Sequence, residues 1–205
     1  LEAEQKEQTL KKEAPRHICD HKNKKLDKGQ IIRLSVDTAS REKISFQDEI
    51  RGNIEWETGL LGDFSLAKDL KIPLYNFAAV IDDLEMEISH VIRGEDHISN
   101  TPRQILIQEA IGAPRPTYLH LPLILATDRS KLSKRKHGES VSLDYYREKG
   151  YLPQAIINYL ALLGWNPGTE QEIFTLDELI KVFDISQIHK GGAIFDEKKL
   201  SLFDP

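Results

Sequence analysis

The chain has 205 residues, of which 40% are hydrophobic and 30% are charged, and its formal net charge is −5. This length allows one domain or two small ones, each with a buried core. No apolar run approaches the roughly 18 residues of a membrane span, and a mildly acidic chain does not coat nucleic acid through its overall charge.

The N-terminal stretch is charged where a signal peptide is apolar, and the single cysteine, Cys19, cannot form an intramolecular disulfide. Both features favour a cytoplasmic protein with no membrane partner. Residue 1 is leucine, and we expect the chain to be a piece of a longer protein.

Residues 1–28 are polar and lysine-rich, which predicts one helix followed by a loop. His17, Cys19 and His21 stand in alternate positions of this segment. That spacing matches no standard zinc knuckle, and no second pair of ligands follows at a suitable distance. We therefore predict no metal site here.

Alternating apolar and polar residues then predict three strands in an antiparallel meander, half exposed to solvent: 30–36, 43–50 and 52–57. The run "YNFAAVI" (75–81) is almost continuously apolar and predicts a strand buried on both faces. Asp82 and Asp83 are expected to turn the chain into a further strand, 87–93.

The predicted strand 87–93 ends in the polar loop "GEDHIS" (94–99), and a helix is predicted to follow. The helix is expected to begin with Thr101 as N-cap and Pro102 at its first position, with Gln104 completing a capping box, and to end at Gly112.

This arrangement places four polar residues at the carboxyl edge of a sheet, where open α/β folds bind ligands: Arg93, Glu95, Asp96 and His97. A solvated turn with internal ion pairs is the alternative.

A second apolar strand, 118–126, leads into "TDRSKLSKRKHGES" (127–140), in which five of the eight residues from Arg129 to Lys136 are cationic. We expect this basic loop at the same edge of the sheet. Closely spaced ammonium groups suit a polyanion such as a nucleoside triphosphate, because they stabilise charge on phosphoryl oxygens. No GxxxxGK[ST] loop occurs in the chain. A nuclear-localisation-like run and plain surface solvation are the alternatives.

Two helices are predicted in the last third of the chain. The first, in 151–165, has Pro153 near its start and Gly164 as its stop, and its apolar stripe comprises Leu152, Ile156, Tyr159, Leu160 and Leu163. The second begins at a capping box formed by Thr175 and Glu178 and runs to about Phe183.

The basic loop contains "KLSKRKHG", which resembles the KMSKS signature loop of class I aminoacyl-tRNA synthetases in the form seen in glutamyl-tRNA synthetases. "YNFAAVIDDLEMEISHVIRGEDHISNTPRQILIQEAIG", "HLPLILATDRSKLSKRKHG" and "GYLPQAIINYLALLGW" resemble the bacterial enzyme in the same order and spacing. The resemblance covers 51 to about 202. It implies an α/β fold, the second half of a Rossmann-like catalytic domain.

The resemblance also implies roles for individual residues. Lys134 is expected to contact the ATP phosphates, with Lys131 and Ser133 shaping the loop. Tyr75 and Arg93 match positions that bind glutamate, and a guanidinium can grip its side-chain carboxylate in bidentate fashion.

The pocket near the adenosine and the tRNA end is expected to comprise Glu95, Asp96, His97, Lys134 and Arg135. Ala79 stands where some members carry Asn, so it is assigned no polar contact. Exposed lysines that follow the loop are candidate tRNA phosphate contacts: Lys181, Lys190, Lys198 and Lys199.

Three parts are expected by similarity: the tail of an inserted acceptor-binding domain (1–56), the second catalytic half (57–138) and the start of a helical stem-contact domain (139–205). The expected substrates are ATP with Mg²⁺, L-glutamate and tRNA(Glu), without a zinc site.

The sequence contains no HIGH-type H-x-G-H motif. The first catalytic half is therefore expected to be missing from this piece. The chain is also expected to stop before an anticodon-binding domain. We predict that it does not aminoacylate tRNA alone and that it self-associates, whereas we expect the parent enzyme to be monomeric.

Two other functions remain open. The first is that of a glutamyl-queuosine tRNA synthetase relative, against which the helical block 151–165 argues. The second is that of a non-catalytic RNA-binding module, whose affinity would fall steeply with salt.

Overall fold

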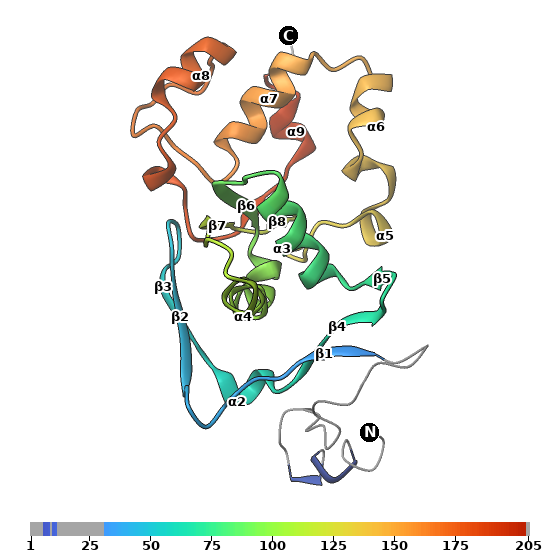
Figure 1. Cartoon of the computed structure of the whole chain (residues 1–205). Helices are drawn as coiled ribbons and strands as arrows, with labels where there is room; N and C mark the ends of the chain where they lie inside the picture. Colours follow the sequence, from blue (N-terminus) through green and yellow to red (C-terminus); the bar gives the residue numbers. More distant parts are fainter. Residues whose placement is uncertain (1–5, 9, 12–30, 204–205) are drawn as a thin grey trace. The chain divides into compact units, whose positions relative to one another are not determined.

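The computed structural model describes residues 6–8, 10–11 and 31–203 (Figure 1). Two predictions lie outside these residues. They are the absence of a metal site at His17, Cys19 and His21, and most of the N-terminal helix. The chain divides into two compact units, the first made of 1–48, 52–91 and 97–118 and the second of 49–51, 92–96 and 119–205.

The first unit contains these elements: β1 (Ile32–Leu34), β2 (Lys43–Asp48), β3 (Gly52–Glu57), α2 (Thr58–Leu61), β4 (Phe64–Asp69), β5 (Ile72–Pro73), α3 (Tyr75–Glu85) and α4 (Thr101–Ile111). The chain passes from one unit to the other within three further elements: β6 (His90–Gly94), the 3₁₀ helix η1 (Glu95–Asn100) and β7 (Thr117–Leu121).

The second unit is mainly helical, and its elements are: β8 (Ile124–Leu125), α5 (Lys134–His137), η2 (Gly138–Val141), α6 (Leu143–Glu148), α7 (Pro153–Leu162), α8 (Leu176–Val182), η3 (Ile185–Gln187), β9 (Ala193–Ile194) and α9 (Glu197–Leu200). Helices and mixed sheets together confirm the predicted α/β class. Within the described ranges, each helix is too short or too polar to cross a bilayer.

The predicted hairpin of β2 and β3 is confirmed, and its two strands pair antiparallel from Lys43–Glu57 to Asp48–Gly52. Alternate side chains of β2 are buried and exposed, as the sequence predicted. Strands β2 and β3 belong to a four-stranded sheet with the order β3-β2-β7-β6, in which β2 and β7 are parallel.

The predicted three-stranded meander is wrong, because β1 pairs with β4 in a second sheet of order β1-β4-β5. Asp63, the residue just before β4, forms hydrogen bonds with β1 and with the segment after it. The alternation of apolar residues does not reveal these contacts. Arg33 donates to the backbone carbonyl of Asp63 at 2.8 Å, and the Asp63 carboxylate accepts from the Val36 amide at 2.8 Å.

The predicted strand at 75–81 is also wrong, since these residues form helix α3. Phe77 and Val80 lie three positions apart and pack together with Ile107 of α4. The same residue types that suit a buried strand therefore satisfy a helical spacing. The chain turns after α3 at Glu87, whose φ is 55°, and not at Asp82 and Asp83, which are helical.

Helix α4 ends at Gly112 as predicted, with this residue in the left-handed conformation. Its predicted start is wrong, because the N-cap is Asn100 and no side chain caps the helix there. The polar loop predicted at 94–99 folds as η1, so Thr101 is already helical, and Gln104 donates to Asn76 at 3.3 Å instead of completing a capping box.

The predicted strand 118–126 is broken into β7 and β8. Pro122 lies at the break and has no backbone N–H to donate to a ladder. Strand β8 leaves the four-stranded sheet and pairs in parallel with β9, so the basic loop follows a different sheet from the one predicted.

Each unit has its own apolar cores. In the first, Ile44 and Phe46 of β2 pack with Ile105 and Tyr118, and the Phe46 and Tyr118 rings meet edge to face. In the second, one cluster contains Tyr146, Tyr159 and Leu200, and another contains Trp165, Phe174 and Leu179. Burial of these side chains is the main stabilising term for each unit.

Helices α7 and α8 are confirmed, including the capping box of Thr175 and Glu178 at the start of α8. The predicted stripe on α7 is confirmed only in part. Tyr159 is buried, but Leu152 and Leu160 remain 49% and 40% exposed.

Candidate functional site

Arg93 lies near the end of β6 and contacts a buried histidine. Its Nε donates to Nε2 of His120 at 3.1 Å, and His120, on β7, has no exposed surface. This hydrogen bond directs the Nε–H of the Arg93 guanidinium at the ring of His120 and so helps to orient the guanidinium.

Glu95 is held from two sides at the start of η1. Its Oε1 accepts from the Leu123 amide at 3.1 Å, and its Oε2 lies 2.7 Å from Nη2 of Arg51. The side chains of Arg51 and Glu95 are only 16% and 28% exposed, so water screens this ion pair weakly.

Asp96, the next residue, pairs with the basic loop. Nζ of Lys131 lies 2.6 Å from its Oδ2, and the two side chains are 53% and 40% exposed. The Asp96 carboxylate also folds back over Gly94, where an added Cβ would approach its Oδ1 to 2.5 Å. Gly94 therefore leaves room for the carboxylate that faces the loop.

The backbone of the basic loop forms a tight hairpin. Ala126 donates to Ser130 at 2.8 Å, and Leu132 donates to Ile124 at 3.0 Å. Arg129 takes the left-handed conformation at the tip, with φ 63°. The loop was predicted at the same edge of one sheet as the segment after Arg93. It instead follows β8, which pairs in a different sheet from β6, and Lys131 meets that segment through its ion pair with Asp96.

Asp128 neutralises part of the positive charge of the loop. Its Oδ2 lies 2.8 Å from Nζ of Lys136, and its Oδ1 accepts from the backbone and hydroxyl of Ser130. The hydrogen bond from Lys136, followed by those from Ser130, lowers the pKa of the Asp128 carboxyl well below its usual range.

Ser133 precedes the short helix α5, and its amide donates to Nδ1 of His137 at 3.2 Å. The other ring nitrogen of His137 lies 3.5 Å from the Ser130 hydroxyl. Lys134 and Arg135 are exposed, and among the described residues their side chains have no hydrogen-bond or ion-pair partner. Two of the three adjacent cations, residues 134–136, thus remain available to an anion.

Tyr75 and His97 form a separate group in the first unit. The Tyr75 hydroxyl lies 3.3 Å from Nδ1 of His97. The same ring nitrogen lies 3.2 Å from Nδ2 of the Asn100 side chain. The rings of Tyr75 and His97 are tilted with centroids 5.8 Å apart. The predicted site residues therefore assemble in two groups, one in each unit.

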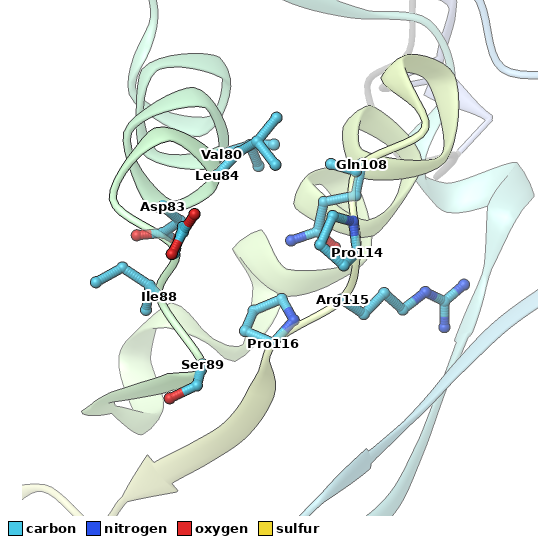
Figure 2. A pocket seen from close by; sticks show the side chains of 11 residues that line it. Val80, Asp83, Leu84, Ile88, Ser89, Gln108, Pro114, Arg115 and Pro116 are labelled. Carbon is cyan, nitrogen blue, oxygen red and sulfur yellow. The ribbon is translucent and has the colours of Figure 1, made fainter.

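Each unit also has a cavity. The first has a volume of about 550 Å³ and lies between the end of α3 and the segment 113–116, with Val80, Leu84 and Pro116 among its walls (Figure 2). None of the predicted site residues lines it. The second, of about 490 Å³, is lined by Leu132 and His137 of the basic loop and by Tyr146.

Sequence reasoning missed four residues that organise the second group: Arg51, His120, Asp128 and His137. Arg51 and His120 lie in segments that read as a turn and an apolar strand, so no motif marks them. Asp128 and His137 lie within the quoted basic loop. The negative charge of Asp128 among cations and the ring nitrogens of His137 could have marked them as partners of the loop residues. In the described ranges, no three His, Cys, Asp or Glu residues cluster as metal ligands.

The sequence model of one family, "tRNA synthetases class I (E and Q), catalytic domain", matches residues 1–202. The chain therefore belongs to the class I tRNA synthetases for glutamate and glutamine.

Within this family, the chain is similar to proteins named glutamate–tRNA ligase. The glutamate–tRNA ligase of Carboxydothermus hydrogenoformans is 49% identical over 98% of this chain and 43% of that protein. The ligase of Desulforamulus reducens is 47% identical over 91% of this chain and 38% of that protein.

A solved structure supports the same assignment. The glutamate tRNA ligase of Elizabethkingia meningosepticum, crystallised in complex with its amino acid, superposes with a TM-score of 0.71 at 40% identity. The match covers 78% of this chain and 35% of that one. The chain thus spans about two fifths of the length of the relatives that it matches.

Proposed function

We propose that this chain supplies the second half of the catalytic domain of a glutamate–tRNA ligase. The supporting observation is the basic loop "KLSKRKHG", with Lys134 and Arg135 exposed, in a chain 49% identical to a protein of that name. The enzyme joins L-glutamate to ATP, which gives glutamyl-adenylate and pyrophosphate, and then transfers the glutamyl group to the 3′ end of tRNA(Glu).

The reaction needs no nucleophile from the protein. The α-carboxylate of glutamate attacks the α-phosphate of ATP, the bond to the β-phosphate breaks, and pyrophosphate leaves. Lys134 stabilises the charge that develops on the phosphoryl oxygens, while Lys131 and Ser133 shape the loop. Mg²⁺ enters with ATP as the counterion of its phosphates.

Arg93 is proposed to bind the side-chain carboxylate of glutamate. Its guanidinium is oriented by the Nε to His120 bond, and a planar fork of donors matches two carboxylate oxygens. The neutral amide of glutamine offers one acceptor and two donors, so it matches the fork poorly. Tyr75, 54% exposed, is proposed as a further glutamate contact.

The adenosine and the tRNA end are assigned to Asp96, His97 and Arg135. Glu95 was predicted in the same pocket, but its contacts with Arg51 and Leu123 favour a supporting role. Asp96 is more exposed, and its lysine partner belongs to the loop that is proposed to receive ATP.

The domain boundaries proposed from the family are 1–56 for the acceptor-binding insertion, 57–138 for the catalytic half and 139–205 for the stem-contact region. The tRNA is proposed to meet exposed lysines of the last part: Lys181, Lys190, Lys198 and Lys199. We further propose a cytoplasmic enzyme.

A chimera tests this function. These 205 residues would replace the matching segment of the Carboxydothermus hydrogenoformans ligase, and charging of tRNA(Glu) with labelled glutamate would be measured. We expect turnover by the chimera and none by the isolated chain, whose sequence lacks an H-x-G-H motif. A folded chimera without turnover, or robust turnover by the isolated chain, contradicts the proposal.

Filter binding of tRNA to the isolated chain at increasing salt tests the alternative of an RNA-binding module. A non-catalytic RNA binder should lose affinity steeply as ionic strength rises. Such behaviour together with an inactive chimera would favour that function over the ligase.

A further inference from the structure

Arg51 connects three segments that are distant in sequence. It lies in the turn between β2 and β3, and its side chain is 16% exposed. Its Nε donates to the His120 carbonyl at 3.1 Å, its Nη1 donates to the Lys190 carbonyl at 2.6 Å, and its Nη2 pairs with Glu95 at 2.7 Å. All three contacts lie within the second unit.

Two of these contacts lead to Arg93. His120 accepts a hydrogen bond at its carbonyl from Arg51 and another at its Nε2 from Arg93. Both guanidinium groups therefore donate to the same residue. Glu95 follows Arg93 by two residues, and Leu123 holds its other carboxylate oxygen. Arg51 therefore fixes the residue on which Arg93 rests and the backbone just beyond Arg93.

We infer that Arg51 is a positioning residue that sets the orientation of the Arg93 guanidinium. The consequence for glutamate binding rests on the proposed function, whereas the orientation itself does not. A lysine could keep the ion pair with Glu95, but one ammonium on a flexible stem cannot reproduce the planar fork that reaches two carbonyls and a carboxylate together. The shape of the arginine, beyond its charge, is what the site requires.

The first experiment measures hydrogen exchange at Nε of Arg93 by NMR in the 205-residue chain. The variants are Arg51→Ala and Arg51→Lys. The control is Arg41→Ala, because Arg41 also donates to a backbone carbonyl, that of Lys43 at 3.0 Å, and pairs with a carboxylate, that of Glu109 at 2.7 Å. Arg41 and both of these partners belong to the first unit, whereas Arg93 belongs to the second.

We expect the exchange of the Arg93 Nε proton to accelerate about tenfold or more in both Arg51 variants, and to stay unchanged in Arg41→Ala. If Arg51→Ala does not fold, Arg51→Lys alone decides. Wild-type exchange at Arg93 in a folded Arg51→Ala variant overturns the inference. Accelerated exchange in Arg51→Ala with wild-type exchange in Arg51→Lys overturns the requirement for the fork.

The second experiment measures kinetics in the chimera. The KM for glutamate should rise about tenfold or more in Arg51→Lys, while the KM for ATP changes less than about twofold. Equal changes in both constants would indicate a general structural role and contradict the inference. An inactive chimera counts against the proposed function, and the NMR result then still decides the role of Arg51.

Discussion

Glu95 and Asp96 are adjacent carboxylates in the second unit, yet their surroundings differ. Glu95 is 28% exposed and is held by a partly buried arginine and a backbone amide. Asp96 is 40% exposed and is paired with one exposed lysine of the basic loop. Removing one partner of a poorly solvated ion pair leaves an uncompensated charge, whereas exposed pairs contribute little to stability.

The candidate site thus has two parts. In the fixed part Glu95 contacts Arg51 and the Leu123 amide, and in the exchangeable part Asp96 contacts Lys131. The contacts of Glu95 hold the backbone around Arg93, which is proposed to bind glutamate. The side chains of Asp96 and Lys131 are both exposed, so an anion from solution can compete for the same ammonium more easily than at Glu95. One carboxylate maintains geometry, and the other holds the loop when no anion is bound.

The largest effect is expected at the residue that the fixed part supports. In the chimera, Arg93→Ala should weaken glutamate binding by about 2 to 5 kcal/mol, because a partly buried charge pair is lost, and leave the KM for ATP nearly unchanged. Steady-state kinetics with each substrate varied measures both. Equal weakening of ATP and glutamate would mean that Arg93 is structural.

The next effect concerns the stability of the isolated chain. Glu95→Gln should reduce the free energy of unfolding by about 1 to 3 kcal/mol, because the Arg51 guanidinium then lacks its counter-charge in a weakly screened place. Urea unfolding measures the change, and Asp96→Asn is the matched control.

Asp96→Asn should cost less than about 1 kcal/mol, and its effect should shrink further in high salt. If the Asp96 variant is destabilised as much as the Glu95 variant, the distinction between the fixed and the exchangeable carboxylate is wrong.

A smaller effect is expected at high pH from Tyr146, whose hydroxyl donates to the Ser140 carbonyl at 2.6 Å. Burial, as the main cause, raises the pKa of Tyr146 to about 12. A folded-state pKa above the unfolded value of 10.0 means that this contribution to stability is complete below pH 10.0 and is lost as pH rises towards 12.

The loss should not exceed about 1.4 kcal/mol per pH unit. Urea unfolding of the wild type and of Tyr146→Phe from pH 9 to 11, about one unit on either side of the ordinary phenol pKa, measures it. The same pH dependence in both proteins would contradict the assignment to Tyr146.

Local patterns predicted the elements whose stability is local. The β2–β3 hairpin follows from alternation, and the start of α8 follows from the Thr175 and Glu178 capping box. The α3 helix was mistaken for a strand, because a short apolar run satisfies both periods and only its packing against α4 distinguishes them.

Non-local contacts were beyond the sequence patterns. The pairing of β1 with β4 depends on Asp63, and the setting of Arg93 depends on Arg51 and His120, which are 42 and 27 positions away along the chain. The signature loop itself was found because its cations lie close together in the sequence. Its neutralisation by Asp96 becomes visible only in three dimensions, whereas the opposite charge of Asp128 already stands within the loop sequence.

The most direct test of the account measures kcat and the KM for ATP in the chimera with Lys134→Ala, with Lys71→Ala, an exposed lysine of the first unit, as control. If Lys134 stabilises phosphoryl charge only as the adenylate forms, kcat should fall about 10²-fold or more while the KM for ATP changes far less. The control should behave as the unsubstituted chimera. An unchanged kcat in Lys134→Ala would contradict the central claim that the exposed cations of the basic loop act on ATP.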